Sequence, residues 1–332
     1  MDTEKILYFC TSFTSSLVNA FKQRPNQLDS VLVVKLDEIG DMMYTLHCIE
    51  AIAQQHPNAA IDVYCKSMNN DLVKQTGVVR NIFNDENELL KRYDLQIDFR
   101  GNWKSLLRAL SGKCTMYLDR GSIRLKNKFH GGQKHEIETN QETIQWLFPD
   151  DYNWSKPILN VSEPDQAFVS SLLEEQGIHK YVVMHCGARD EARRWPTDRF
   201  ASVIDHIHEK YSLKTVLVGS PNEQELNAEV CNQTTNAINF AGKTNLLQLG
   251  ALMRSAKFFV GNESGPLHFA IVEQKPLVAL FGPGVKDVFY PLYPNQKVIH
   301  HLEDQPTEAD KQNSIFKISE QEVIDAVEGL TF

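Results

Sequence analysis

"FFVGNESGPLHFAIVEQKPLVALFGP", from Phe258 to Pro283, decides the fold class of this 332-residue chain. An apolar run ends in the polar turn Asn262–Pro266, a second apolar run of helical length follows, and a third ends in Gly282 and Pro283. Short apolar runs bounded by turn residues are typical of buried strands, and the longer run between them is typical of a helix. The stretch therefore predicts a strand, a helix and a second strand parallel to the first.

The same alternation continues through the rest of the chain. In the first half the predicted strands are Val31–Leu36, Ile61–Cys65, Leu95–Phe99 and Cys114–Leu118. In the second half they are Tyr181–His185, Thr215–Gly219, Ala237–Gly242, Lys257–Gly261 and Leu277–Gly282. Segments with helical periodicity, such as Met42–Gln55, lie between them. Strands that alternate with helices in this way form parallel sheets, so the predicted fold class is α/β.

Two domains follow from this repetition, because each half carries its own series of strands. The polar, proline-bearing stretch Asp150–Pro164 separates the two series, which places the boundary near residue 160. A chain of 332 residues is long enough to bury two cores. We expect an N-terminal Rossmann-like domain at 1–160 and a C-terminal one at 161–332, facing each other across a cleft.

Composition and charge exclude several classes of protein. Charged residues are 23% and hydrophobic ones 42%, as in ordinary globular chains. The six cysteines show no zinc-site or disulfide spacing, which favours reduced thiols in a cytosol. The N-terminus begins with acids and its apolar stretch is interrupted, so neither a signal peptide nor a spanning helix is predicted, which argues against a periplasmic binding protein. A formal charge of -9 disfavours nucleic-acid binding.

The charge is uneven along the chain. Between Lys91 and Lys134 there are eleven basic residues against three acids. Such a stretch is either a solvated helix face or a surface that receives a phosphorylated or carboxylated partner. Both interpretations stay open at this point.

The turn in the opening stretch has the features of an anion site. Gly265 allows a ligand to approach the backbone closely, and Pro266 has no N–H to satisfy in a first helical turn. With Ser264 at the helix start, free amides and the positive end of the helix dipole would point outward, as in phosphate sites. An ordinary capped helix start is the alternative. His268, in the same first turn, faces either that ligand or the protein interior.

Two further strand-to-helix loops carry candidate ligand groups. "HCGARDEARRWPTDRFASVIDHI" places Gly187 in a loop that brings Arg193 and Arg194 to a helix start, where arginines suit bidentate phosphate contacts. "GSPNEQELNAEV" offers Glu223 or Glu225 for ribose hydroxyls. Exposed arginines and a favourable charge at a helix N-terminus are the respective alternatives.

In the first half the corresponding turn is "KLDEIGDMMYTLHCIEAI". Asp41 stands where the helix begins and either caps it or serves as a functional carboxylate. In the functional interpretation the helix end keeps Asp41 ionised and aimed into the cleft, ready to accept a proton from a hydroxyl.

Together these segments resemble one family. "VLVVKLDEIGDMMYTLHCIEAIAQQHPNAAIDVYC" is similar to the opening of glycosyltransferase family 9, the heptosyltransferases of bacterial lipopolysaccharide synthesis. The similarity continues in order through "YDLQIDFRGNWKSLLRALSG", "HCGARDEARRWPTDRFASVI", "VLVGSPNEQELNAEV" and the opening stretch, and spans roughly Val31 to Pro283. The resemblance implies a GT-B fold and inverting transfer of a sugar from a nucleotide diphosphate donor, without a required metal or other cofactor. The chain has no Asp-x-Asp metal motif, in agreement with this.

The resemblance also assigns roles to residues. Asp41 matches the family's catalytic base, Arg194 falls where a phosphate-binding lysine is usual, and Glu223 falls near its ribose-binding acid. The segment Glu263–His268 matches the family's Asp-Ser/Thr-Gly-x-x-His, whose amides hold the diphosphate and whose acid contacts the donor sugar. The resulting donor-site prediction comprises Gly187, Arg193, Arg194, Glu223, Glu263, Ser264, Gly265, Pro266, Leu267 and His268.

The resemblance implies ADP-heptose as donor and a lipopolysaccharide core or related glycan as acceptor. Arg100, Arg120 and Arg124 follow predicted strands of the acceptor half, so we expect them to contact an acidic acceptor. The protein would be cytoplasmic and would visit the inner membrane leaflet through the basic stretch. Asp37 and Glu38 replace a small Ser-rich pair, and Glu263 is longer than the usual Asp. Another donor sugar, a non-catalytic homologue that binds sugar nucleotides and a nucleotide-sugar epimerase are therefore the alternatives.

Overall fold

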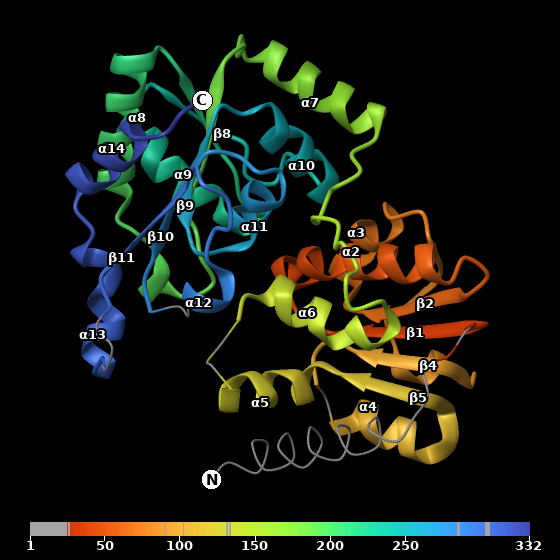
Figure 1. Cartoon of the computed structure of the whole chain (residues 1–332). Coiled ribbons are helices and arrows are strands. Elements are labelled where there is room, and N and C mark those ends of the chain that lie inside the picture. The colour runs from red at the N-terminus through yellow and green to blue at the C-terminus, as the bar shows by residue number, and fades with distance from the viewer. Residues whose placement is uncertain are drawn as a thin grey trace. The chain divides into compact units, whose positions relative to one another are not determined.

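The structure is a computed structural model that describes residues 25, 27–89, 91–101, 103–130, 132, 134–283, 286–302 and 306–332. The N-terminal apolar stretch and Cys10 lie outside these residues. The chain divides into two compact units, residues 1–158 and residues 159–332, drawn in Figure 1 from red to yellow-green and from yellow-green to blue. Each unit is built on one parallel sheet, which confirms the predicted α/β class.

The sheet of the first unit has five strands in the order β3-β2-β1-β4-β5. Their bounds are Ser30–Lys35 (β1), Ala60–Cys65 (β2), Val79–Phe83 (β3), Tyr93–Asp98 (β4) and Cys114–Asp119 (β5). Every strand pair is parallel, and Val34 of β1 is in register with Tyr64 of β2 and Asp98 of β4. The carboxyl ends of these strands therefore lie along one edge of the sheet.

Helices cover this sheet by burying apolar faces. They span Ile39–Gln55 (α2), Asn70–Lys74 (α3), Trp103–Arg108 (α4), Arg120–His130 (α5) and Glu136–Ile144 (α6). Leu32 and Val34 lie on the same face of β1, where they pack with Leu106 of α4 and Tyr117 of β5. α6 packs against α2, whose side chains from Met42 to Ile49 are all buried. These contacts fix the start of α2 at the end of β1.

The sheet of the second unit has six parallel strands in the order β11-β10-β9-β6-β7-β8. Their bounds are Tyr181–His185 (β6), Lys214–Leu217 (β7), Ala237–Asn239 (β8), Phe259–Asn262 (β9), Leu277–Phe281 (β10) and Gln296–His300 (β11). β6 and β9 are neighbours at the centre, and each runs into a loop that holds predicted donor-site residues.

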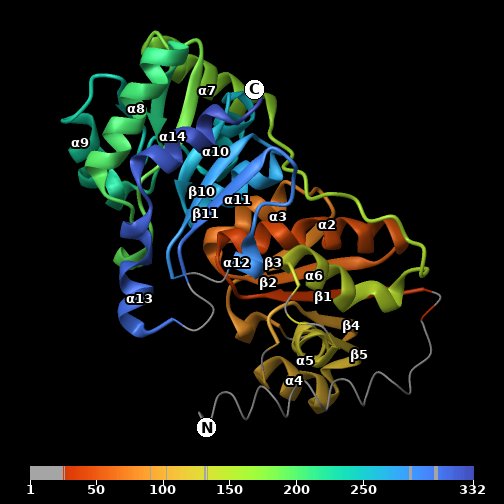
Figure 2. The same cartoon turned by 60° about the vertical axis from the view of Figure 1, so that its left-hand side comes forward.

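The helices of the second unit span Glu163–Glu175 (α7), Thr197–Tyr211 (α8), Gln224–Cys231 (α9), Leu246–Ser255 (α10), Gly265–Val272 (α11), Lys286–Phe289 (α12), Glu308–Asn313 (α13) and Glu320–Glu328 (α14). α8 and α14 lie side by side in both views of the molecule (Figures 1 and 2). Phe200 and Ile204 of α8 and Val323 of α14 close one core over Val182 and Met184 of β6. Within the described residues, no helix is both long and apolar enough to cross a bilayer.

Nine strands were predicted from the sequence, and two of the four edge strands, β3 and β11, were not among them. The residues of β3, "VRNIF", and of β11, "QKVIH", are exposed or only partly buried. An edge strand buries less surface than a central one, so its sequence lacks the continuous apolar run on which the prediction relied. The predicted strand Ala237–Gly242 ends earlier, at Asn239. The helix predicted from Met42 begins at Ile39.

Candidate active site

Asp41 lies in the first turn of α2, just after β1. The N-cap of this helix is Glu38, so the alternative in which Asp41 caps the helix is wrong. The Asp41 side chain is 21% exposed, and its Oδ1 lies 4.0 Å from Nζ of Lys35, the last residue of β1. Asp41 is therefore at the carboxyl edge of the sheet, where parallel sheets bind ligands.

A cluster of buried charges surrounds Asp41. The Lys35 and Glu136 side chains are both 0% exposed, and Lys35 Nζ lies 3.2 Å from Glu136 Oε1 and 3.0 Å from Asp37 Oδ2. One guanidinium nitrogen of Arg120 lies 2.6 Å from Glu136 Oε1 and donates to the carbonyl of Phe99 at 2.6 Å. Glu136 thus neutralises two buried cations. Removing Glu136 would leave two buried cations without their shared partner, so we expect this carboxylate to hold the cluster together.

The cluster shifts the pKa values of its two partly buried acids, Asp37 and Asp41, in opposite directions. Burial raises the pKa of Asp41, and the charges of Glu136 and Asp37 add to this, while Lys35 and Arg120 oppose it. Burial also acts to raise the pKa of Asp37, but Lys35, Arg120 and other cations outweigh it and lower that pKa. The helix end was expected to keep Asp41 ionised; the surrounding side chains and burial act on its charge as well, and their net effect raises the pKa of Asp41. A carboxylate with a raised pKa is a stronger proton acceptor than an ordinary one.

The three arginines expected to contact an acceptor differ in exposure. Arg120 begins α5 but is only 3% exposed, because it is paired with Glu136, so its placement does not favour a surface contact. The side chains of Arg100 and Arg124 are 50% and 42% exposed. Arg100 Nε lies 3.7 Å from Asp37 Oδ1, and Arg124 lies 3.4 Å from Glu136 Oε2. Both therefore reach from the cluster to solvent.

In the second unit, the predicted diphosphate turn joins β9 to α11. Ser264 is the N-cap and has extended backbone, but its hydroxyl does not cap the helix. Pro266 occupies the first turn, and a Cβ placed on Gly265 would meet nothing within 4 Å. The start of α11 is therefore open on the side of Gly265. Leu267 is fully buried in the core and so anchors the turn. His268 is 9% exposed, with its ring 5.5 Å from that of Phe289.

The hydroxyl of Ser264 is engaged by a residue that sequence analysis passed over. His185, the last residue of β6, has Nδ1 2.7 Å from Ser264 Oγ and Nε2 3.1 Å from Glu223 Oε1. Ser264 Oγ is also 3.0 Å from the carbonyl oxygen of Asn262. From the sequence His185 was expected only as a strand end, although it lies two residues before Gly187 of the arginine loop, which is a signal for a site residue. It connects two loops that lie far apart in the chain.

Glu223 is held over Gly187. Its Oε2 accepts hydrogen bonds from the amide and hydroxyl of Ser220, at 2.7 and 2.8 Å. A Cβ on Gly187 would lie 1.7 Å from Glu223 Oε1, so glycine is required there to make room for the carboxylate. Burial acts to raise the pKa of Glu223, but the hydrogen bonds from His185 and Ser220 outweigh it and lower the pKa to about 2. Glu223 is therefore a fixed anion that accepts hydrogen bonds.

The arginine loop supplies two cations with different partners. Arg193 lies 3.1 Å from Glu263 Oε1, and burial raises the pKa of Glu263 although Arg193 opposes this. Arg194 donates from Nε to the carbonyl of Ala188 at 2.9 Å, and its side chain is 37% exposed. The neighbouring Trp195 is 1% exposed, and its backbone amide donates to Asn262 Oδ1 at 3.2 Å.

A sequence model described as glycosyltransferase family 9 (heptosyltransferase) matches residues 86–318. The chain belongs to glycosyltransferase family 9. It is 25% identical over 278 residues to lipopolysaccharide heptosyltransferase 3 of Escherichia coli, covering 73% of this chain and 80% of that relative. The structure of E. coli ADP-heptose lipopolysaccharide heptosyltransferase II is 24% identical and covers 90% of this chain and 97% of that one, with a TM-score of 0.70. An iron-containing dodecameric glycosyltransferase from E. coli, TibC, is 11% identical, covers 92% and 77%, and has a TM-score of 0.59.

These findings confirm the predicted family, the GT-B fold and an enzyme that transfers glycosyl groups. In this family 9 glycosyltransferase, Asp41 and its charge cluster belong to the first unit, whereas the predicted donor residues belong to the second. The structure brings Gly187, Glu223 and Ser264 together around His185. It pairs Arg193 with Glu263 but gives Arg194 other partners.

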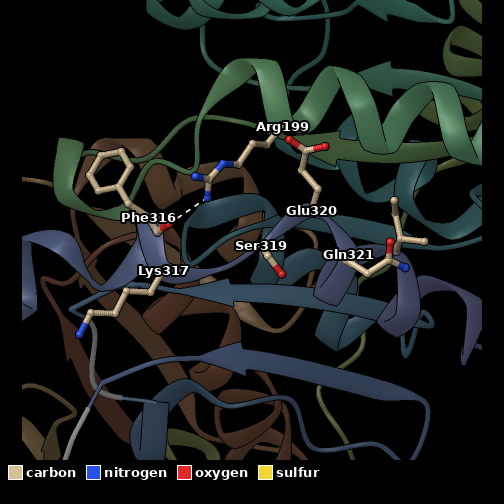
Figure 3. Close-up of a pocket in the computed structure, with 7 residues that line it drawn as sticks. Arg199, Phe316, Lys317, Ser319, Glu320 and Gln321 are labelled. Carbon is tan, nitrogen blue, oxygen red and sulfur yellow. Dashed lines mark hydrogen bonds between the residues drawn. The ribbon is translucent and has the colours of Figure 1, made fainter.

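Two other features of the described residues bear on site chemistry. The His, Cys, Asp and Glu side chains of the described ranges form no group of three that could hold a metal ion. A surface pocket of about 470 Å³ lies between α8 and α14 and contains none of the predicted site residues (Figure 3). Its Arg199 donates to the carbonyls of Phe316 and Ile318, at 2.9 and 2.6 Å. That arginine therefore tethers the chain before α14.

Proposed function

We propose that this glycosyltransferase moves heptose from ADP-heptose to a lipopolysaccharide core or a related glycan, with inversion at the anomeric carbon and without a metal. The donor and acceptor are carried over from the names of its relatives, which are lipopolysaccharide and ADP-heptose heptosyltransferases. Unit 1 would bind the acceptor and unit 2 the nucleotide sugar, with the boundary near residue 160. The observation that carries the proposal is Asp41, a carboxylate with a raised pKa at the carboxyl edge of the first sheet.

Asp41 would act as general base on the acceptor hydroxyl. The proton moves to a carboxylate oxygen of Asp41 as the acceptor oxygen attacks the anomeric carbon and the bond from that carbon to the diphosphate breaks. The raised pKa of Asp41 makes it a better proton acceptor. Lys35, 4.0 Å away, stabilises the ionised form of Asp41 before the reaction. Once Asp41 is protonated, Glu136 and Asp37 still balance Lys35.

The diphosphate would lie at the start of α11. The open side of Gly265 and the helix dipole favour negative charge there. Arg193 and Arg194 would take up charge that develops on the leaving diphosphate. Glu223 and Glu263 are the acids for ribose and donor sugar. His268, whose ring lies next to that of Phe289, is the last of the proposed donor-site residues in this segment.

Replacing Asp41 by Asn tests the mechanism. The amide keeps the shape and occupies the same place without accepting a proton, so transfer should fall by about 10² to 10⁴ while donor affinity is kept. Product formation from ADP-heptose and a heptose-accepting core oligosaccharide is the measurement, with and without a chelator, since one structural neighbour contains iron. Near wild-type transfer by Asp41→Asn would place the base elsewhere, and loss of transfer with chelator would refute metal independence.

The donor and the alternatives are separated by two assays. We expect ADP-sugars to raise the melting temperature more than UDP-, GDP- or CDP-sugars, because a ligand at a hundred times its dissociation constant stabilises by about 2.7 kcal/mol. Donor binding without transfer to any acceptor would identify a non-catalytic homologue. Release of an epimerised sugar in place of a glycoside would identify an epimerase.

We further propose that the protein is cytoplasmic and that unit 1 contacts the inner leaflet. Trp103, Leu107 and Leu110 are 42%, 53% and 59% exposed and are spaced as one helical face along α4 and the turn after it. Lys104, Arg108 and Lys113 of the basic stretch lie close to these residues in the sequence. Apolar side chains flanked by lysines suit the boundary of an anionic bilayer.

Co-sedimentation with vesicles of anionic and of zwitterionic phospholipids tests this contact. Binding should require anionic lipid, weaken with salt, and fall when Leu107 and Leu110 are both replaced by Ser. The same pair of changes at exposed Phe168 and Phe316 of unit 2 is the control. If binding does not depend on salt or on lipid charge, the basic stretch is a solvated face and not a membrane contact.

A further inference from the structure

His185 is placed to link the two loops of the proposed donor site. It ends β6, and β9 lies beside it in the sheet. Its side chain is 4% exposed, and both ring nitrogens lie within hydrogen-bond distance of a side-chain oxygen. One oxygen belongs to Ser264 at the start of α11, and the other to Glu223. In the proposed function, Ser264 lies at the diphosphate site and Glu223 is the acid that binds the ribose.

Each end of this link is itself fixed. Glu223 is held by two hydrogen bonds from Ser220 and fits only because position 187 is glycine. Ser264 Oγ lies between His185 Nδ1 and the carbonyl oxygen of Asn262, at 2.7 and 3.0 Å. A buried polar array with short contacts at both ends positions its members more rigidly than exposed side chains do.

Counting protons shows which form of His185 completes the array. The carboxylate of Glu223 accepts only, so His185 Nε2 must donate to it. The carbonyl of Asn262 also accepts only, so the single hydroxyl proton of Ser264 is needed there. Ser264 Oγ can then only accept from His185 Nδ1. All three hydrogen bonds therefore form together when both ring nitrogens carry protons. With Nδ1 unprotonated, the hydroxyl of Ser264 must give up one of its two contacts.

We propose that His185, as an imidazolium, is a positioning residue that ties Ser264 to Glu223 and sets both for a nucleoside diphosphate. This inference rests on the proposed function of unit 2 as the donor domain. The imidazolium places a positive charge behind Ser264, on the protein side of the turn that receives the diphosphate. It adds to the helix dipole of α11 without touching the ligand.

Other ionisable groups lie near the array and must be separated from it. Glu223 faces the ring directly, Cys186 follows His185 in the chain, and Glu263 and His268 flank Ser264. Arg193 is paired with Glu263. A comparison that retains all of these groups and changes only His185 isolates its contribution to any dependence on pH.

Calorimetric titration of the full chain with ADP provides that comparison. His185→Gln keeps a side chain that can donate and accept but carries no charge and does not titrate. His206→Gln is the matched control, because His206 also pairs with a glutamate of unit 2, Glu328 at 2.9 Å, but on the outer surface of α8. The ratio of dissociation constants, variant over wild type, cancels the ionisation of ADP and of the other protein groups.

At about pH 6, His185→Gln should bind ADP about tenfold more weakly than wild type, as expected for loss of a charge-assisted hydrogen bond. The ratio should become smaller as the pH rises, because only a ring with both nitrogens protonated supplies the charge that glutamine lacks. His206→Gln should give a ratio near one throughout. A ratio for His185→Gln that stays at one, or stays constant with pH, would overturn the inference.

Thermal unfolding identifies a variant that has lost its fold. If His185→Gln does not melt cooperatively, Ser264→Ala takes its place, because it removes the partner of Nδ1 and leaves the ring. The ADP affinity of Ser264→Ala should lack the dependence on pH that His185 gives the wild type. If Ser264→Ala shows the same pH dependence as wild type, the inference is overturned. Failure of the wild type to bind ADP, UDP, GDP or CDP at any pH would instead refute the proposed donor site itself.

Discussion

At Asp41 two opposing effects act on one carboxyl group. Burial and two neighbouring anions raise its pKa, and Lys35 and Arg120 lower it, with the net direction upward. The balance matters because the base must be ionised to accept a proton, yet basic enough to take one. Activity should therefore fall as the pH drops through this raised pKa, at a higher pH than an ordinary aspartate would give.

The first prediction concerns that acid limb. The charge of Asp37 raises the pKa of Asp41, so Asp37→Asn should lower it and move the acid limb of kcat/KM to lower pH. The profile of kcat/KM against pH measures the shift, which should amount to about half a pH unit to one unit for a neighbour of this kind. Asp71→Asn, on α3 of the same unit, is the control and should leave the limb unmoved. A limb at the same pH in Asp37→Asn would contradict the assignment of Asp41 as the titrating base.

The second prediction concerns Asp119, which ends β5 opposite Asp98. Burial, with the charge of Asp98, raises the pKa of Asp119 to about 7. The folded protein therefore keeps a proton that the unfolded chain, with a pKa of about 4, has already released. The resulting stability is complete below about pH 4 and is lost as the pH rises through about 7.

Asp119→Asn removes this loss, because the amide stays neutral. The melting temperature of the variant relative to wild type should therefore increase between about pH 5 and about pH 8.5. Asn retains one acceptor for the amides of Gly121 and Ser122, which bond to the two carboxylate oxygens, so a constant offset is also expected. Parallel melting curves across this pH range would show that Asp119 titrates normally.

Residues of this kind could be predicted from sequence only in part. Asp41 and the segment Glu263–His268 stand out because a polar turn follows an apolar strand. Lys35 and Glu136 do not, since a lysine at a strand end usually points to solvent and its partner lies 101 residues away. Arg120 was expected to contact an acceptor because it follows a predicted strand, yet it is buried against Glu136. Burial of a charge depends on a partner from another element, which a single local pattern does not contain.

At the scale of elements, glycine has a different structural role in each of two strand-to-helix loops. Gly187 follows β6 and leaves room for the carboxylate of Glu223, whereas Gly265 begins α11 facing open space. Gly265 was predicted as a donor-site residue because glycine lets a ligand approach, and Gly187 because its loop brings arginines to a helix start. For Gly187 the structure gives another reason, which is a side chain of the same unit.

The third prediction compares alanine at these two positions. Gly265→Ala should leave the melting temperature unchanged or slightly higher, because alanine fits a helix start and restricts the unfolded chain. ADP affinity should nevertheless fall, if the diphosphate lies against that backbone. Gly187→Ala should displace Glu223 and cost about 1 to 3 kcal/mol of stability as well as ADP affinity. Thermal unfolding and ADP titration measure both; unchanged ADP affinity in Gly265→Ala would remove the diphosphate from the start of α11.

At the scale of the whole molecule, each unit has a complete sheet and its own buried core. Parallel order could be predicted because strands and helices alternate in both halves. The sequence indicates a boundary only near residue 160, whereas in the structure the second unit begins at Leu159. Leu159, which is 1% exposed, packs over Gly250 of α10, and its carbonyl accepts a hydrogen bond from Arg254 at 2.6 Å.

The fourth prediction uses this contact. A fragment of residues 159–332 should fold alone and bind ADP without catalysing transfer, because its core and proposed donor residues are complete while Asp41 is absent. A fragment of residues 161–332, which lacks Leu159, should be less stable by about 2 to 4 kcal/mol, the usual cost of losing a buried leucine. Chemical denaturation of both fragments measures the difference. Equal stability would mean that Leu159 contributes nothing to unit 2.

Trp195 gives unit 2 an optical reporter. The other three tryptophans, Trp103, Trp146 and Trp154, all precede residue 159. The indole of Trp195 is buried against Phe200 and donates to the carbonyl of Ile318, and its backbone is tied to Asn262 beside the Ser264 turn. With those three replaced by phenylalanine, the emission of one chromophore would follow both the unfolding of unit 2 and the arrival of a nucleotide at the start of α11. Stopped-flow fluorescence could then time donor binding without a label.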